Sequence, residues 1–224
     1  DLYESYAGSI LATMALGAAA FAGPLQLKAV MAPSLIAACG VLLSLIGIFM
    51  VKTKEGAGMK ELLRALAIGT NTAAFLIAGV TFGIFAWLFG TETNQWWQVS
   101  LSVVVGLLAG VIIGKSTEYY TSQSYKPTQK VSESSQTGSA TVIISGLGLG
   151  MLSTAIPVVT VGVAIILAYL CANGFNIEFS AANLSMGLYG IGIAAVGMLS
   201  TLGITLATDA YGPIADNAGG NAEM

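Results

Sequence analysis

The sequence predicts an all-α integral membrane protein, a bundle of long transmembrane helices, and three observations predict it. Hydrophobic residues make up 55% of the 224 residues and charged residues only 8%, whereas an ordinary soluble domain has roughly a quarter charged residues. The eight basic and eleven acidic residues leave six long uncharged runs, each of at least 22 residues. About 20 apolar residues in a helix cross a hydrocarbon core, and lipid offers backbone N–H and C=O groups no partner outside the helix. The composition therefore excludes a soluble globular domain.

The six uncharged runs predict six spans within one transmembrane helical region that covers residues 1–224. The first span stops before Gly23 and Pro24, because that pair interrupts a helix. The second and third fill the uncharged stretches that end at Lys52 and Glu92. The expected spans are approximately 3–22, 29–51, 65–90, 96–114, 139–172 and 181–208.

Glycine and proline patterns predict how the fourth and fifth spans pack and bend. Gly106, Gly110 and Gly114 recur every four residues, so they place bare backbone on one helix face where another helix can approach closely. Pro157 removes the helical hydrogen bond to the carbonyl of Ser153 and is expected to bend the fifth span there.

The distribution of basic residues predicts the orientation. Seven of the eight lie in two segments, Lys52 to Arg64 and Lys115 to Lys130. The positive-inside rule assigns both segments to the cytoplasm, and the polar stretch 117–137 is then a cytoplasmic loop. By parity Asp1 and the segment Asp209 to Met224 face the same side.

Several kinds of chemistry are excluded. The chain has no histidine and a formal net charge of −3, so we expect no nucleic-acid partner, because phosphate binding needs a concentrated positive surface. Cys39 and Cys171 lie in apolar runs without companions at metal-ligand spacing, which argues against a zinc site or a disulfide framework.

A first polar cluster opens the first span. Asp1, Glu4 and Ser5 lie on one helix face at spacings of three and four residues. An ionised carboxylate in the bilayer costs at least about 2.5 kcal/mol unless it is paired or binds a cation. An acid within the membrane indicates a functional site. The alternative is a water-accessible helix N-terminus, where negative charge suits the helix dipole.

A second polar cluster follows the last span. Asp209, Asp216 and Glu223 recur at intervals of seven and lie near one helix face, and Asn217 adds an amide oxygen. Such oxygens are ligands of hard cations such as Mg²⁺, which binds through few carboxylates while it bridges phosphate oxygens. The cluster indicates a metal–phosphate site, with a solvated helix end as the alternative.

The segment DAYGPIADNAGGNAEM, from Asp209 to Met224, closely resembles the signature of membrane-bound pyrophosphatases, which couple pyrophosphate hydrolysis to ion pumping. Three further stretches resemble the corresponding parts of that family in the same order: DLYESYAGS from Asp1, KSTEYYTSQSYKP from Lys115 and GMLSTLGI from Gly197. The resemblance extends over essentially the whole chain.

The resemblance implies a subunit of sixteen transmembrane helices that forms a homodimer, of which the six spans would be the sixth to the eleventh. It implies an ion-translocating hydrolase that splits inorganic pyrophosphate into two phosphates and pumps Na⁺, or alternatively H⁺, outward across a prokaryotic cell membrane. The substrate would be a Mg²⁺ complex bound on the cytoplasmic face, with K⁺ and Na⁺ as activators. The chain begins at Asp1 without a methionine, so we expect an interior fragment of a longer polypeptide.

The resemblance also implies roles for individual residues. Asp216 matches a metal-ligating aspartate and is the expected catalytic-site residue, as a ligand rather than as the base, with Asp209 and Asn217 beside it in the Mg²⁺–pyrophosphate site. Asp1 matches an aspartate of the family's ion-coupling funnel. Glu4 follows it by three residues, as in sodium-pumping members, and Ser5 adds an oxygen for the cation.

A cation-coupled secondary transporter without hydrolytic activity is the alternative function. Intramembrane acids and bent, glycine-rich helices also suit a cation site near the middle of a symporter. The segment Asp209 to Met224 discriminates between the two functions, because a transporter has no need for acids at seven-residue spacing outside the bilayer.

Overall fold

The computed structural model describes residues 2–92, 94–178 and 180–224, except for the side chain of Met59. Asp1, an expected coupling residue, therefore lies outside the described residues. Within the described ranges all regular structure is helical. The elements are α1 (Leu2–Ala20), α2 (Pro24–Met50), α3 (Met59–Phe89), α4 (Gln95–Thr121), α5 (Lys126–Glu133), the 3₁₀ helix η1 (Ser134–Thr137), α6 (Ser139–Ser153), α7 (Ala155–Ala172), α8 (Ala181–Leu199) and α9 (Leu202–Glu223).

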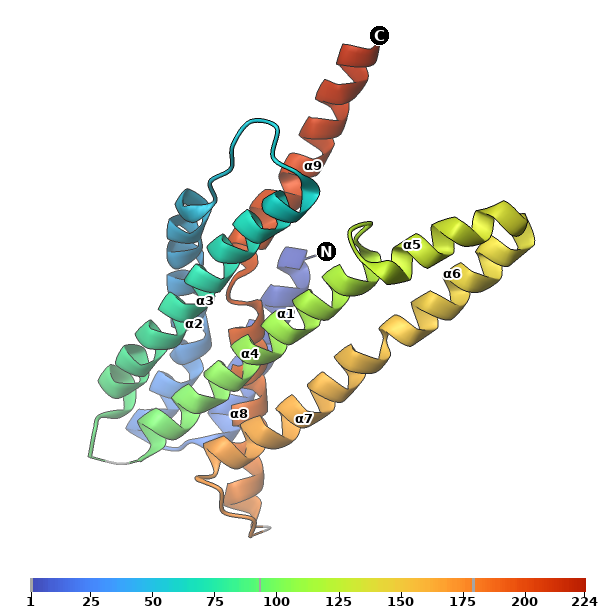
Figure 1. The fold of residues 1–224 in the computed structure, drawn as a ribbon. Helices are drawn as coiled ribbons and strands as arrows, with labels where there is room; N and C mark the ends of the chain where they lie inside the picture. The colour runs from blue at the N-terminus through green and yellow to red at the C-terminus, as the bar shows by residue number, and fades with distance from the viewer. Residues whose placement is uncertain (1, 93, 179) are drawn as a thin grey trace.

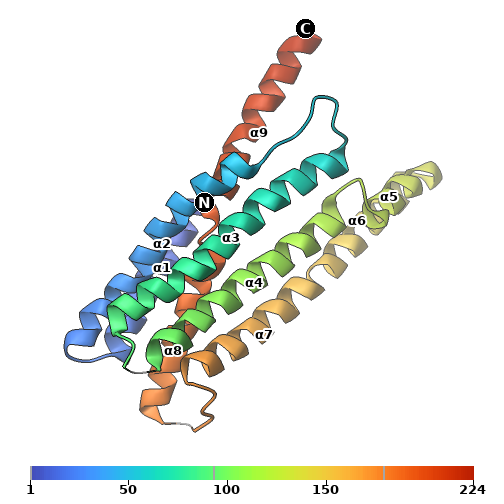
Figure 2. The ribbon, with the colours of Figure 1, turned by 60° about the vertical axis from the view of Figure 1, so that its left-hand side comes forward.

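The long helices lie side by side in one bundle (Figures 1 and 2). α4 packs against α3, α7 and α8, and α2 packs against α1, α3 and the start of α9. The connection between α2 and α3, helix α5, the start of α1 and the end of α9 lie toward one end of the bundle. The segments rich in lysine and arginine are at that end, which we call the basic end.

Five stretches of the described residues are helical, long and apolar enough to cross a membrane, by length and composition. They correspond to the second to sixth expected spans. α1 is not one of them, although a first span was expected there, because the polar residues of its first two turns lower its hydropathy. α1 nevertheless packs along α2 and α8 as part of the bundle. The stretches are Pro24–Met50, Lys60–Phe89, Gln95–Thr137, Ser139–Ala172 and Ala181–Leu199.

Helix breaks divide the fifth and sixth expected spans. α6 ends at Ser153 and α7 begins at Ala155, so the bend expected from Pro157 is confirmed. α8 ends at Leu199 and α9 begins at Leu202, a break that the sequence reasoning did not predict. The stretch 117–137, expected as a loop, contains the end of α4, the whole of α5 and η1.

The glycine repeat of α4 brings α4 and α8 into close contact. A Cβ at Gly106 would clash with the carbonyl oxygen of Ala194, and one at Gly110 would lie 3.2 Å from Met198 Cγ. The predicted close approach is confirmed at these two positions. It is wrong at Gly114, where a Cβ would meet nothing within 4 Å, because the helices have diverged there and leave a cavity.

An aromatic cluster and one buried hydrogen bond join the N-terminal helices to α8. Phe21 stacks on Phe89 with ring centroids 5.2 Å apart and meets the edge of Tyr189 at 5.3 Å. Tyr189 is fully buried, and its Oη donates a hydrogen bond to Ala29 O at 2.9 Å. Most buried hydroxyls in proteins are hydrogen-bonded, and this bond fixes α8 against the start of α2.

Candidate functional site

Helix α9 carries the expected hydrolytic residues away from the bundle. Leu202 and Ile204, in its first turn, are buried, while every residue from Thr205 to the end is exposed. Figures 1 and 2 show the helix projecting beyond the basic end. Asp209 and Asp216 are therefore solvent-exposed carboxylates on this projecting segment.

Asn217 lies one residue after Asp216 on the same helix. Its Nδ2 donates a hydrogen bond to Pro213 O at 2.7 Å, which leaves the amide oxygen as its available acceptor. α9 continues through Pro213 without a break, but proline has no N–H to donate to the carbonyl of Asp209. A side-chain carboxylate and an unpaired carbonyl thus occur together at position 209.

These residues match Mg²⁺ in kind, but only one carboxylate can bind each ion. Asp209 and Asp216 are separated by about 10 Å along the helix axis, whereas Mg²⁺ binds oxygens at about 2.0–2.1 Å in octahedral geometry. Across the described part of the chain, no three His, Cys, Asp or Glu side chains gather closely enough to hold a metal ion. Asp216 can supply one ligand, and the others must come from substrate, water or other protein groups.

The first turn of α1 holds the other expected site. Glu4 and Ser5 are exposed there, and Asp1 precedes the described residues. Hydroxyl groups continue from this turn into the core: Ser9 Oγ donates to Ser5 O at 2.9 Å, and Thr13 Oγ1 donates to Ser9 O at 2.7 Å. Thr13 is 1% exposed. The spacing of four residues at positions 5, 9 and 13 was visible in the sequence, but the sequence reasoning did not include the last two.

A cavity of about 350 Å³ lies between α1, α2 and the base of α9. Tyr3, Tyr6 and Ile10 line it from α1, and Gly203 and Leu206 line it from α9. Tyr6 is 2% exposed, yet its Oη makes no hydrogen bond within the described structure. The two expected sites, on α1 and α9, are thus not brought together directly, and this cavity lies between the helices that carry them.

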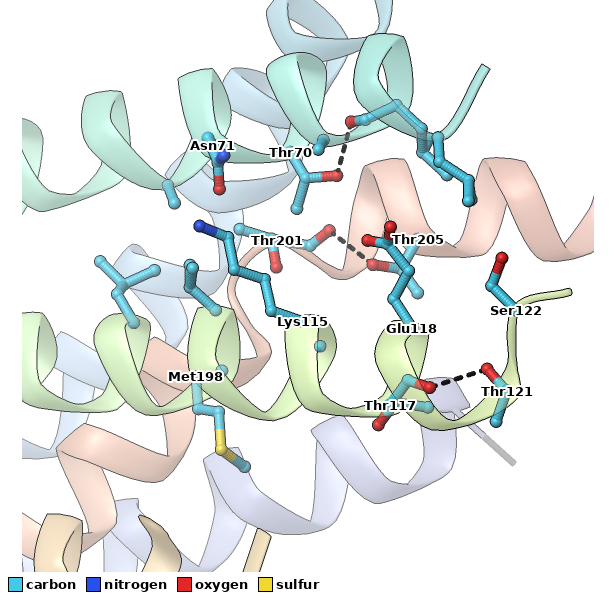
Figure 3. A pocket seen from close by; sticks show the side chains of 18 of the residues that line it. Thr70, Asn71, Lys115, Thr117, Glu118, Thr121, Ser122, Met198, Thr201 and Thr205 are labelled. Carbon is cyan, nitrogen blue, oxygen red and sulfur yellow. Dashed lines mark hydrogen bonds between the residues drawn. The ribbon is translucent and has the colours of Figure 1, made fainter. Parts of the chain in front are cut away.

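A larger cavity, of about 900 Å³, lies between α3, α4 and the junction of α8 with α9. The motif that begins at Lys115 forms one wall, with Lys115 and Glu118 projecting into the cavity (Figure 3). Tyr125 Oη donates to Glu118 Oε1 at 3.1 Å, and this hydrogen bond raises the pKa of Tyr125. The motif was recognised in the sequence, but nothing there indicated a cavity.

Comparisons with known proteins cover the whole chain. The profile of the family described as "Inorganic H+ pyrophosphatase" matches residues 1–224. The chain is 68% identical to a protein of Bacteroides thetaiotaomicron named "Putative K(+)-stimulated pyrophosphate-energized sodium pump", over 228 residues that cover 100% of this chain and 30% of the relative.

Two further relatives carry related names. A Clostridium tetani protein with the same name is 41% identical, over 100% of this chain and 31% of the relative. A Methanosarcina mazei "K(+)-insensitive pyrophosphate-energized proton pump" is 40% identical with the same coverage. The chain spans about 30% of the length of the curated relatives that it matches.

Proposed function

Because this chain belongs along its whole length to the inorganic H⁺ pyrophosphatase family, we propose that it takes part in the hydrolysis of inorganic pyrophosphate to two phosphates, coupled to outward pumping of a cation across a membrane. The proposal assigns the substrate to α9 and the transported cation to α1. Both assignments concern the full-length protein, to which other segments would contribute.

The observation that supports this function best is the course of α9. A single helix begins in the buried core at Leu202 and ends as an exposed, acid-bearing segment at the basic end. A metal complex of a highly charged substrate must be bound from water, because charges are costly to bury without partners. Because α9 is one helix, a movement of the exposed segment on substrate binding would nevertheless be transmitted to the buried residues at its start.

Asp216 would act as a ligand of Mg²⁺ in the substrate complex, with Asp209 and Asn217 as neighbouring polar groups. Bound Mg²⁺ would neutralise charge on the pyrophosphate oxygens. The residues of this chain would hold and orient the complex, while the base that activates water would come from elsewhere in the protein. K⁺ and Na⁺ would act as activators.

The cation would bind near Asp1, Glu4 and Ser5 and be coupled to hydrolysis through the contact between α1 and α9. Substrate binding would shift α9, and the shared cavity at Tyr6 gives its base room to move. Two sites are coupled when both bias the same structural equilibrium. Here that equilibrium would be the position of the base of α9 against α1.

Na⁺ is the favoured cargo and H⁺ the alternative. Glu4 has the placement that is similar to sodium-pumping members, and the relative at 68% identity is named as a sodium pump. We further propose a homodimer in a prokaryotic cell membrane, with the hydrolytic site on the cytoplasmic face. The gathering of basic segments at the same end as α9 supports that orientation.

The test uses the full-length protein in sealed vesicles. We expect phosphate release from pyrophosphate that requires Mg²⁺ and is stimulated by Na⁺, with simultaneous uptake of radiolabelled Na⁺ into the vesicles. Uptake of protons alone would change the cargo to H⁺. Cation transport without any phosphate release would refute the hydrolase and favour the secondary transporter.

Asp216→Ala should abolish phosphate release in the same vesicles, because it removes a metal ligand. Glu133→Ala, at an exposed acid of α5 outside this cluster, is the control and should retain it. Near-normal turnover in Asp216→Ala would remove Asp216 from the metal site.

A further inference from the structure

The cavity of about 900 Å³ between α3, α4 and the α8–α9 junction has no part in the function proposed above. Its volume is within the range of about 300–1,000 Å³ typical of small-molecule sites. Gly114 lies in its wall, and a Cβ there would meet nothing within 4 Å. The cavity therefore lies at a level where α4 and α8, which pack tightly at Gly106, are no longer in close contact.

The lining changes from apolar to charged along α4. Leu107 and Val111, together with Ala74 of α3, form the end nearer the middle of the bundle. Lys115 follows, then Glu118 one turn further toward the basic end. Beyond them the polar residues of the mouth are Thr121, Ser122 and Gln123. Along α4 the order toward the basic end is thus apolar surface, cation, anion and water-accessible polar groups, whereas α3 places Leu63 and Leu66 nearer that end.

The two charged side chains do not neutralise each other. Lys115 and Glu118 have the spacing at which opposite charges on a helix can pair, but the described residues contain no contact between them within ion-pair distance. Figure 3 shows Lys115 extended toward Asn71 and Glu118 turned toward Thr205. Lys115 is exposed and Glu118 half-buried. Within the described structure Glu118 Oε1 accepts the hydrogen bond from Tyr125 Oη, which leaves Glu118 Oε2 and the Lys115 ammonium available to a ligand.

We propose that this cavity binds one phospholipid whose headgroup carries a phosphate and a primary ammonium, a phosphatidylethanolamine. Its acyl chain lies against Leu107 and Val111, its phosphate is bound by Lys115 and Asn71, and its ammonium donates to Glu118. In the leaflet at the basic end, the acyl chain, the phosphate and the ammonium of such a lipid follow one another from the membrane interior toward water. Along α4 the apolar residues, Lys115 and Glu118 follow one another in the same direction. Basic pockets between transmembrane helices on the cytoplasmic side bind anionic headgroups, whereas the lining of this cavity contains both Lys115 and Glu118.

The half-buried carboxylate of Glu118 determines which lipid headgroup fits the cavity. Phosphatidylglycerol would place its phosphate beside Lys115 but only neutral hydroxyls beside Glu118, and phosphatidylserine would bring an additional carboxylate together with its ammonium. A choline headgroup has a positive charge but no N–H to donate. Only a headgroup with both a phosphate and an ammonium that carries protons satisfies Lys115 and Glu118 together. This proposal is independent of whether the protein hydrolyses pyrophosphate.

The experiment is native mass spectrometry of the full-length protein, delipidated in detergent and then exposed to equal amounts of phosphatidylethanolamine, phosphatidylcholine and phosphatidylglycerol with identical acyl chains. We expect preferential retention of phosphatidylethanolamine. Lys115→Gln should weaken its binding about fivefold, which corresponds to ~1 kcal/mol for one basic residue near a lipid surface. Glu118→Gln should remove the preference over phosphatidylglycerol. Lys130→Gln, at an exposed lysine of α5, should bind like the unaltered protein.

A cavity-filling variant tests whether the lipid binds inside the cavity, because it leaves the charges of Lys115 and Glu118 unchanged. Gly114→Leu should exclude the lipid while it leaves the fold intact, because the position has open space around it. Gly79→Leu, at an exposed glycine of α3 with equally open surroundings, is its control, and circular dichroism verifies the fold of both. Equal retention of the three lipids, a preference for phosphatidylglycerol, or retention unchanged in Gly114→Leu would overturn the proposal. Displacement of the lipid by millimolar inorganic phosphate would likewise overturn it, by identifying a free-phosphate site.

Discussion

A single methyl group at Gly106 tests how much the close contact between α4 and α8 contributes to stability. A Cβ at this position would clash with the carbonyl oxygen of Ala194, and a backbone oxygen cannot rotate away as a side chain can. Overpacking a tight interior costs about 1–3 kcal/mol. The rigidity of the backbone here places Gly106→Ala near the upper end of that range.

Gly114→Ala is the matched comparison, because it lies on the same helix and in the same four-residue repeat. A Cβ at Gly114 would meet nothing within 4 Å. Alanine favours a helix over glycine by about 1 kcal/mol, and this gain is common to both variants. It cancels in the comparison, so the difference between their free energies of unfolding should equal the overpacking cost of about 1–3 kcal/mol.

The assay is unfolding of the full-length protein in mixed micelles with increasing sodium dodecyl sulfate, followed by circular dichroism. Gly106→Ala should unfold at a distinctly lower detergent fraction than Gly114→Ala. Equal free energies of unfolding would refute the reasoning, because they would mean that α4 and α8 can separate at Gly106 without cost.

Tyr189→Phe removes the buried hydroxyl that hydrogen-bonds to α2 and should lower the free energy of unfolding by about 1 kcal/mol; the exposed Tyr211→Phe should change it by less than about 0.5 kcal/mol, and equal losses would contradict a special role for the buried bond. Glu4→Gln should abolish the stimulation of pyrophosphate hydrolysis by Na⁺, and an unchanged Na⁺ response would exclude Glu4 from the cation site. The hydrogen bond to Glu118 raises the pKa of Tyr125 above its usual value of about 10, so its stabilising contribution is complete below about pH 10 and is lost as the pH rises through the raised pKa. Ultraviolet titration of Glu118→Gln should show one tyrosine ionising at lower pH, and a titration identical to that of the unaltered protein would count against this bond.

Much of the fold follows from composition, because the alternation of apolar runs with charges is a direct consequence of the bilayer. The bend near Pro157 was predictable for a similar reason, since proline cannot donate a helical hydrogen bond. The break between α8 and α9 was not. It falls inside an uncharged run without proline, where Gly203 packs directly against Ser44 of α2. That close approach is a tertiary contact, which a single sequence does not display.

The candidate site was predictable in its residue types and not in its surroundings. The acids of α9 stood out because they recur outside the apolar runs. The cavity beside Lys115 depends on where α3 and α4 diverge, and the cavity beside Tyr6 depends on where α1 passes α9. Both are set by the angles between helices, which residue spacing alone does not determine.

The way α9 is attached has a mechanical consequence. Asp216 lies fourteen residues beyond Leu202, or about 21 Å along a straight helix, and only the first turn is held by buried side chains. A tilt of about 10° at that base would displace Asp216 by nearly 4 Å by the same geometry, roughly twice a Mg²⁺–oxygen bond length of about 2.0–2.1 Å. Because α9 is held only at its base, a small movement there becomes a larger displacement at Asp216. Sub-ångström placement of the carboxylate therefore requires lateral support along the exposed sides of α9, and release of that support would convert a small rotation at the base into a displacement large enough to make or break a metal ligand.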